Sequence, residues 1–370
     1  PTRRSSDLHI CFFIGSISNG AGTERITISL ANLFVKRGYR VSVVSLCQSD
    51  PPFFSVHREI NTYCIFTEPC AFTLYFFQIV RRLYLYLKKE RVDILINVDV
   101  ILAIFSIPLK LFLSSIKIIS WEHFNYKSNL GISRRDWGRK LSQKYANAIV
   151  TLTKQDRSFY LEKRYNRAIV YAIPNFLDSF PSRYANMNSK LVLAVGRYTY
   201  QKGFDILIEI WNEVKTYPIA KDWKLRIVGN GEDREKLIAQ AKSLDLLSSI
   251  EFCTAQKDIS NYYITSSIYV MTSRYEGLPM VLLEALSYGL PIVSYDCLTG
   301  PREIVSDNIN GYIIPVDQKD FFIKKLIRLF ESKDDRLDMQ KKAIELSYQY
   351  SIDGAFNLWQ ELFSTLLNSK

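Results

Sequence analysis

The sequence predicts two Rossmann-like, doubly wound α/β domains that face a cleft, and three observations lead to this prediction. Short apolar strands alternate with helical patterns along nearly the whole chain, which is typical of parallel sheets covered by helices. The polar stretch 178–190 interrupts this alternation and is expected to be a linker. A chain of 370 residues is also long enough to form two ordinary domains.

The first predicted domain covers residues 8–177, and the second covers residues 190–350. In the first domain a helix is expected over 24–36, ended by Gly38, and strands are expected at 8–15, 40–46, 93–97, 117–121 and 148–152. In the second domain strands are expected at 191–196, 224–229, 250–252, 268–272, 292–294 and 311–315. A last helix, 353–367, follows the second domain. Ligands of such sheets bind beyond the carboxyl ends of the strands.

The positive charge of the chain is concentrated in its first half. The whole chain has a net charge of +11; residues 1–180 hold 25 Lys and Arg against 13 Asp and Glu, whereas residues 181–370 hold 23 against 24. A basic half suggests an anionic partner, either a membrane surface or a polyanion. The alternative is a solvated basic face without a dedicated partner.

Composition places the chain among globular proteins rather than membrane-spanning ones. The most apolar candidate span, 94–114, is interrupted by Asn97, Asp99, Pro108 and Lys110. Residues 1–7 are polar and lack an initiator Met, so a tail, a truncation or a cloning remnant is expected there, without a secretory signal. The cysteines form no C-x-x-C pair, so reduced core thiols of a cytoplasmic protein are expected rather than disulfides or a zinc site: Cys11, Cys47, Cys64, Cys70, Cys253 and Cys297.

The most informative segment is Ser273-Arg-Tyr-Glu276-Gly-Leu-Pro-Met-Val-Leu-Leu-Glu284-Ala-Leu-Ser-Tyr-Gly289-Leu-Pro291. Glu276 follows an apolar strand, and a helix over 279–288 is expected to end at Gly289. Glu276 therefore lies at a strand-to-helix turn, where the free N–H groups of a helix N-terminus suit a diphosphate. Two glutamates eight residues apart are common on solvent-exposed helix faces. The functional interpretation of this pair therefore depends on the whole segment 273–291.

Four further turns place glycine and polar residues after predicted strands, where a ligand can be approached closely. They are Gly15-Ser-Ile-Ser-Asn-Gly-Ala-Gly22-Thr-Glu-Arg25, Gly196-Arg197-Tyr-Thr-Tyr-Gln-Lys202-Gly203, Val228-Gly229-Asn-Gly231, and Asp296-Cys-Leu-Thr299-Gly300-Pro301-Arg-Glu-Ile304. Arg197 and Lys202 are spaced so that both can reach the phosphates of a nucleotide diphosphate. The string Ser120-Trp-Glu-His123 follows another strand; a lone histidine is usually structural, but a strand-end position favours a functional role.

These segments together resemble glycosyltransferase family 4, a group of retaining sugar transferases with the GT-B fold. Residues 276–284 resemble its E-x7-E signature, and residues 196–203 resemble its G-R-x(4)-K-G segment. The string T-G-P-x-E-I at 299–304 is similar to that of bacterial surface-polysaccharide members, many of which use UDP-hexoses or UDP-hexosamines. At the first turn Ala21 stands where the family usually has glycine. The resemblance also implies that the last helix packs back on the first domain.

The resemblance implies a role for each residue that matches the motifs. His123 would contact the donor sugar near the reacting carbon, Glu276 the sugar hydroxyls, Glu284 the ribose hydroxyls, and Arg197 and Lys202 the diphosphate. The other implied donor-binding residues are Gly22, Gly229, Gly277, Leu278, Pro279, Met280, Thr299 and Gly300. The chain contains no D-x-D, so no metal and no cofactor are expected; the nucleotide sugar is a substrate.

The expected function is transfer of a hexose or N-acetylhexosamine from a nucleotide sugar, expected to be UDP-linked, to a lipid-linked or growing glycan of an O-antigen, capsule or exopolysaccharide. The segment 72–89 mixes aromatic residues with four cations and is expected to be either a helix docked on anionic lipid or an ordinary sheet-covering helix. In the first case it would form a membrane-facing basic surface with Lys110, Lys117, Arg134, Arg135, Arg139 and Lys140. The protein would then be cytoplasmic and peripheral at the inner leaflet.

Two alternatives remain beside this interpretation, and a third is not expected. A mannosyltransferase that uses GDP-mannose has the same expected fold, and so does a nucleotide-sugar epimerase, although the paired motifs argue against the epimerase. A nucleic-acid partner is not expected, because no helix-turn-helix, zinc or RNA-recognition motif is visible. The sequence leaves the oligomeric state open.

Overall fold

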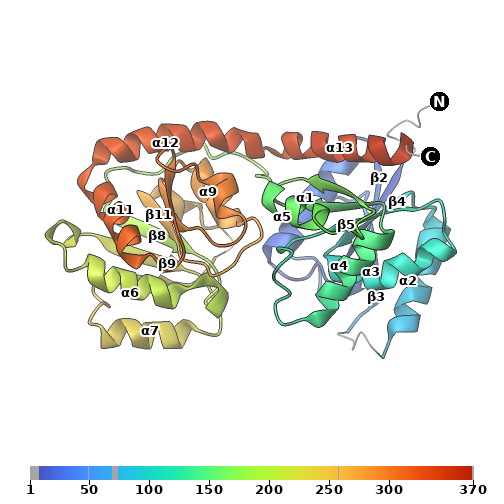
Figure 1. Cartoon of the computed structure of the whole chain (residues 1–370), viewed down its shortest axis with the longest axis horizontal. Helices are drawn as coiled ribbons and strands as arrows, with labels where there is room; N and C mark the ends of the chain where they lie inside the picture. Colours follow the sequence, from blue (N-terminus) through green and yellow to red (C-terminus); the bar gives the residue numbers. More distant parts are fainter. Residues whose placement is uncertain (1–7, 49, 69–73, 257, 369–370) are drawn as a thin grey trace. The chain divides into compact units, whose positions relative to one another are not determined.

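A computed structural model describes residues 8–48, 50–68, 74–256 and 258–368 (Figure 1). Residues 1–7, Cys70 and the first two positions of the segment 72–89 lie outside the described residues. The chain divides into two compact units: unit 1 comprises residues 1–176 and 352–370, and unit 2 comprises residues 177–351. Each unit is a parallel sheet with its own helices.

Unit 1 contains a seven-stranded parallel sheet in the order β3-β2-β1-β4-β5-β6-β7. Its strands are β1 (His9–Ile14), β2 (Arg40–Cys47), β3 (Asn61–Phe66), β4 (Ile94–Val98), β5 (Lys117–Trp121), β6 (Ala148–Thr151) and β7 (Ile169–Ala172). Its helical segments are α1 (Gly22–Lys36), α2 (Phe76–Glu90), η2 (Val100–Leu102), α3 (Ala103–Ser106), η3 (Ile107–Leu111), α4 (Ser133–Tyr145), α5 (Lys154–Leu161) and α13 (Ile352–Asn368). The central strands β1 and β4 are buried along their whole length, as expected of a sheet covered on both faces.

Unit 2 contains a six-stranded parallel sheet in the order β10-β9-β8-β11-β12-β13. Its strands are β8 (Leu191–Val195), β9 (Lys224–Val228), β10 (Ile250–Cys253), β11 (Ile268–Met271), β12 (Ile292–Tyr295) and β13 (Gly311–Ile314). Its helical segments are η4 (Tyr200–Lys202), α6 (Phe204–Val214), η5 (Pro218–Ala220), α7 (Arg234–Ser243), α8 (Ser260–Ile264), α9 (Met280–Ser287), α10 (Pro301–Ile304), α11 (Lys319–Glu331), α12 (Lys333–Ser347) and η6 (Tyr348–Tyr350). One core cluster joins β8, β9, α6 and α11.

The predicted strands and the doubly wound fold class are confirmed, and the structure adds two strands that the sequence analysis missed, β3 and β7. The polar stretch expected to be a linker lies within unit 2. There the Ala185 N–H donates to the Tyr288 carbonyl, and the Arg336 guanidinium donates to the Met187 carbonyl. These bonds attach the stretch to the end of α9 and to α12.

The last helix, α13, belongs to unit 1 although it follows unit 2 in the chain (Figure 1). Phe356 and Phe363 of α13 pack on Phe34 of α1, with ring centroids 5.6 and 5.5 Å apart. Trp359 meets Trp121 at the end of β5, with ring centroids 5.1 Å apart. The core of unit 1 is therefore completed by the C-terminal residues of the described chain.

Helix α2 covers the sheet of unit 1 with one face, in agreement with the more ordinary of its two predicted roles. Ile79, Leu83, Tyr86 and Leu87 are buried on that face.

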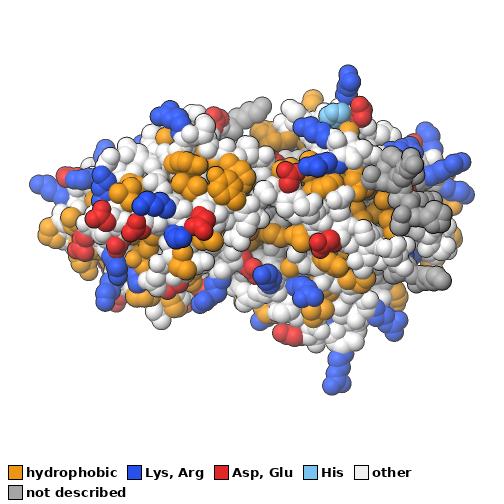
Figure 2. Space-filling view, turned by 90° about the horizontal axis from the view of Figure 1, so that it is seen from above, with side chains coloured by type: hydrophobic (Ala, Val, Ile, Leu, Met, Phe, Trp, Pro, Cys, Tyr) orange, Lys and Arg blue, Asp and Glu red, His pale blue; other side chains and the backbone are white. Residues whose placement is uncertain are grey.

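Among the described residues, no helix combines the length and the apolar character that crossing a membrane requires. Figure 2 shows hydrophobic, basic and acidic side chains interspersed over the visible face.

Candidate active site

The predicted donor-binding residues of unit 2 follow three neighbouring parallel strands. Arg197 and Lys202 come after β8, Glu276 comes after β11, and Thr299 comes after β12. Because β8, β11 and β12 are adjacent and parallel, these residues gather at one edge of the sheet, the carboxyl edge. Ligands of open α/β sheets bind at this edge.

An ion pair between Lys202 and Glu276 is the centre of this group. The Lys202 Nζ lies 2.6 Å from Glu276 Oε1, and the two side chains are only 15% and 6% exposed. The neighbouring Gln201 amide donates to the Tyr275 carbonyl at 3.0 Å. The cation predicted to bind phosphate and the carboxylate predicted to bind sugar hydroxyls therefore neutralise each other in this structure.

The turn after Glu276 is held by the turn after β12. The Thr299 hydroxyl donates to the Glu276 carbonyl at 2.6 Å. Gly300 has φ +98°, and a Cβ there would lie 2.5 Å from the Gly277 carbonyl oxygen and 2.6 Å from Pro279 Cδ. Only glycine allows this conformation and this close approach. Gly277, Leu278 and Pro279 are thereby fixed directly before α9, whose first residue is Met280; its N-cap Pro279 provides no side-chain cap.

The turn after β8 carries the second predicted cation. The Arg197 side chain is exposed, and its guanidinium has no hydrogen bond or ion pair among the described residues, so its donors are available to a ligand; only the Arg197 carbonyl is engaged, by the Thr199 N–H. Gly229 lies after β9, and a Cβ at this position would come 1.8 Å from the Gly196 carbonyl oxygen. Gly229 is therefore explained by the contact between two strand-end turns.

Glu284 lies on α9, about one turn after the first residue of the helix, Met280. The Tyr263 hydroxyl donates to Glu284 Oε2 at 2.7 Å. The Tyr263 ring stacks on Tyr288, with centroids 5.0 Å apart and an angle of 5° between the ring planes. Tyr263 thus orients the carboxylate predicted to hold ribose hydroxyls, although no motif in the sequence points to this tyrosine.

A second pair that the sequence analysis missed supports Lys202. Arg274 forms two hydrogen bonds with the Asp205 carboxylate, at 2.9 and 2.7 Å, and also donates to the Tyr200 carbonyl. The bond to Tyr200 attaches η4, which carries Lys202, to the residues that follow β11, and the bonds to Asp205 attach the start of α6 to them. The only hint in the sequence was the position of Arg274 beside Glu276.

His123 and Gly22 belong to unit 1, and the structure describes them there. Gly22 is the first residue of α1, after the loop that follows β1. His123 follows β5 at the carboxyl edge of the unit 1 sheet; it is 8% exposed, and its Nε2 has no hydrogen-bond partner among the described residues. Burial, with a smaller effect of the Arg135 charge, lowers the pKa of His123 to about 3. The imidazole is therefore neutral at physiological pH.

Two buried ion pairs lie beside His123. They show that the predicted membrane-facing basic surface was wrong in two of its residues, Arg135 and Arg139. Arg139 contacts Glu122 at 2.7 Å, and Arg135 contacts Asp99 at 2.7 Å. Both arginines are buried, so they are not part of a membrane-facing basic surface. The prediction was wrong because the sequence does not reveal the carboxylates that lie opposite α4. Burial raises the pKa of Asp99 to about 6, and the Arg135 charge only partly opposes this rise.

We expect His123→Asn to weaken the pH dependence of stability. The folded-state pKa of His123 lies below its unfolded value, so protons bind the unfolded chain more readily, and stability falls as pH falls below about 6.5. This contribution, at most roughly 1.4 kcal/mol per pH unit, disappears in the variant. Thermal melts at several pH values would measure it. His57→Asn is the control, and equal pH dependence in wild type and His123→Asn would contradict the prediction.

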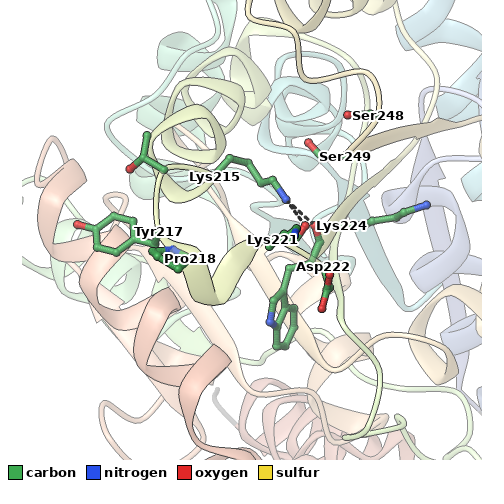
Figure 3. Close-up of a pocket in the computed structure, with 10 residues that line it drawn as sticks. Lys215, Tyr217, Pro218, Lys221, Asp222, Lys224, Ser248 and Ser249 are labelled. Carbon is green, nitrogen blue, oxygen red and sulfur yellow. Dashed lines mark hydrogen bonds between the residues drawn. The ribbon is translucent and has the colours of Figure 1, made fainter.

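A hollow of about 660 Å³ in unit 2 lies away from this group (Figure 3). Its lining residues include Lys224, which begins β9, and Ser248 and Ser249, which precede β10, so it opens at the amino ends of the strands. The Lys215 ammonium donates to the carbonyls of Ala220 and Lys221, both at 2.8 Å. The ammonium is thus engaged by backbone, and the hollow does not join the carboxyl edge.

Comparison with known proteins gives matches over both units. The family described as "Glycosyltransferase Family 4" matches residues 20–179, and "Glycosyl transferases group 1" matches residues 175–346. An uncharacterized glycosyltransferase of Haemophilus influenzae is 36% identical over 95% of this chain and 98% of its own length. The amylovoran biosynthesis glycosyltransferase AmsD of Erwinia amylovora is 31% identical over 96% and 99%.

More distant matches include an enzyme of Campylobacter jejuni, 24% identical over 98% of this chain and all of its own length. Its name is GalNAc-alpha-(1->4)-GalNAc-alpha-(1->3)-diNAcBac-PP-undecaprenol alpha-1,4-N-acetyl-D-galactosaminyltransferase. Among solved structures, the lipopolysaccharide outer core galactosyltransferase WaaB has a TM-score of 0.79 at 21% identity, covering 97% of this chain and all of WaaB. Anabaena HepE in complex with UDP has a TM-score of 0.76 at 16% identity, covering 97% and 99%. These structures share the GT-B fold with this chain.

Proposed function

Because the chain belongs to glycosyltransferase family 4, whose members use nucleotide-sugar donors, we propose that it transfers a hexose or N-acetylhexosamine from a UDP-sugar to a glycan acceptor. The acceptor is a lipid-linked or growing chain of a bacterial surface polysaccharide. The anomeric configuration is retained, and no metal is required.

The observation that carries this proposal is the buried Lys202–Glu276 pair at the carboxyl edge of unit 2. Lys202, Arg197 and the N–H groups at the start of α9 offset the charge that builds on the departing diphosphate. Glu276 accepts hydrogen bonds from hydroxyls of the donor sugar, and Glu284 accepts them from the ribose. Since protein cations supply the positive charge, a bound metal has no necessary role in this scheme.

The proposed reaction path is attack on the face that the leaving group vacates. The departing phosphate stabilises the positive charge at the anomeric carbon and accepts the proton of the acceptor hydroxyl. The neutral His123 contributes hydrogen bonding near the reacting carbon rather than a second positive charge. Product stereochemistry tests this path, because a β-linked product from an α-linked donor would contradict it.

The names of the relatives support the substrate class. The Campylobacter relative is named as an α-transferase of N-acetylgalactosamine to an undecaprenyl-pyrophosphate-linked glycan. WaaB is named as a galactosyltransferase, and HepE is described in complex with UDP. By this comparison we propose a lipid-pyrophosphate-linked acceptor and a place of action at the cytoplasmic face of an anionic membrane.

Thermal-shift titration tests the donor. UDP, GDP, ADP, UDP-sugars and GDP-mannose are added to wild type and to Arg197→Ala. Binding to the folded state alone stabilises the protein by about 2.7 kcal/mol when the ligand is present at 100 times its Kd. Stabilisation by UDP and one UDP-sugar, lost in Arg197→Ala, is the expected result. A response to GDP and GDP-mannose alone would indicate mannosyl transfer, and no response to any nucleotide would contradict the proposal.

A further inference from the structure

We propose that unit 1 docks on anionic lipid by inserting an apolar patch made of Phe77, Leu85, Leu111 and Phe112. This inference deepens the proposed function, on which it rests for the acceptor, by naming the surface that meets the membrane. The evidence for the docking surface does not depend on catalysis. It consists of large apolar side chains that are exposed to water and lie near cations.

The outward face of α2 supplies half of the patch. Phe77 is 84% exposed, and Leu85 is 47% exposed. The cations Arg81 and Lys88 are exposed on the same helix. Positions 77, 81, 85 and 88 recur at helical spacing, so they form one stripe opposite the buried face of α2. A helix with one apolar face in the core and a second, mixed apolar and basic face outside has the composition of an interfacial helix.

The end of η3 supplies the other half. Leu111 is 83% exposed, and Phe112 is 72% exposed. The Phe112 ring contacts the Tyr84 ring of α2 edge-on, with centroids 6.1 Å apart, so the two segments adjoin. Four large apolar side chains thus gather on neighbouring elements, whereas a soluble surface normally exposes such residues singly.

The charges around the patch favour a lipid partner. Four cations of α2, Arg81, Arg82, Lys88 and Lys89, lie in a stretch, 74–89, that contains no Asp or Glu, and 107–117 contains none either. Glu90, which ends α2, is paired with Arg40. Each Lys or Arg close to an anionic bilayer contributes about 1 kcal/mol to binding. Lysine is depleted in protein–protein interfaces, and such interfaces need about 20–30 residues on each side. A second copy of the chain is therefore a poorer occupant than lipid headgroups and acyl chains.

The apolar patch changes how the binding of the protein to lipid is expected to depend on salt. A purely basic surface would lose its lipid affinity as salt screens the charges. Insertion of Phe77, Leu111 and Phe112 adds burial of apolar surface, which salt does not screen. We therefore expect vesicle binding that weakens with rising salt but does not vanish.

Vesicle sedimentation of the full chain tests this inference. The vesicles are phosphatidylcholine alone or phosphatidylcholine with phosphatidylglycerol. The test variant is Phe77→Ser, Leu111→Ser and Phe112→Ser combined; the matched control carries Leu247→Ser, Ile309→Ser and Val316→Ser, three exposed apolar residues of unit 2. All six side chains are exposed, so both variants are expected to remain folded. We expect wild type and control to bind the anionic vesicles, and the test variant to lose about tenfold or more in affinity.

Equal vesicle binding by wild type and test variant would overturn the inference, and so would failure of wild type to bind anionic vesicles. If wild type instead forms a dimer that the test variant loses, the patch is a contact between copies and the lipid proposal is wrong. The UDP-induced thermal shift is measured on the same samples. A normal shift with absent vesicle binding would refute only the docking surface, whereas vesicle binding without any nucleotide response would refute only the proposed donor.

Discussion

Lys202→Met is expected to lower turnover about 10²–10³-fold, the usual cost of losing one preorganised donor to a developing negative charge. Lys202 is mostly buried and is aimed by its contact with Glu276, so it offers a positioned cation at the carboxyl edge. Steady-state transfer with the donor identified by thermal shift would measure the effect. We expect the loss mainly in kcat, because the charge on the diphosphate grows as the glycosidic bond breaks.

Two variants separate this role from a structural one. Lys202→Met leaves the buried Glu276 carboxylate without its cation, which costs stability. Adding Glu276→Gln removes that carboxylate charge and is expected to restore the melting temperature but not turnover. Lys215→Met is the matched control in the same unit, since its ammonium binds only backbone carbonyls. Turnover of Lys202→Met within a factor of about three of wild type would contradict the assigned role.

Arg139→Met is expected to destabilise unit 1 by about 3–5 kcal/mol, because it leaves a buried carboxylate uncompensated. Arg139 donates to Glu122 at 2.7 Å and to the carbonyls of Asn125 and Ser128 at 2.9 and 2.8 Å. The Tyr160 hydroxyl completes the set by donating to Glu122 at 2.8 Å. This network fixes the chain directly before and after His123, so the loss of stability is centred on the candidate site.

Amide hydrogen exchange measures this effect for unit 1 alone, which matters because a chain with two units need not unfold in one step. Faster exchange in β5 and α4 is expected, with exchange in unit 2 unchanged. Lys140→Met, an exposed position on the same helix, is expected to change stability by no more than roughly 0.5 kcal/mol. Similar exchange in the two variants would show that the Glu122 network is not stabilising.

The sequence was sufficient to predict the strands that are apolar throughout and the turns that follow them. Strands such as β1, β5 and β8 are short runs of buried residues, and glycine marks the turns near Glu276 and Lys202. The edge strand β3 was missed because it is mostly not fully buried and its residues, Asn61–Phe66, mix polar and apolar types. An edge strand needs only one apolar face, so its run of apolar residues is interrupted and harder to identify in the sequence.

Pairings between distant residues could not be predicted. Lys202 and Glu276 were each assigned a ligand, whereas the structure shows them bound to each other across 74 residues of chain. Arg135 and Arg139 were assigned to the surface because arginine is rarely buried without a partner. Their partners, Asp99 and Glu122, are identified only when the strand ends and α4 come together in the fold.

The position of α13 has a consequence for synthesis on the ribosome. Chains fold as they emerge, and units generally form in the order in which they are made. Here the core of unit 1 is incomplete until residues 352–368 have been made, because Phe34 and Trp121 lack their contacts with Phe356, Phe363 and Trp359 until then. Unit 2 is contiguous, from Leu177 to Ser351, and is complete earlier. Unit 1, most of which precedes unit 2 in the chain, is thus expected to mature after unit 2, and until then it exposes aromatic surface to chaperones.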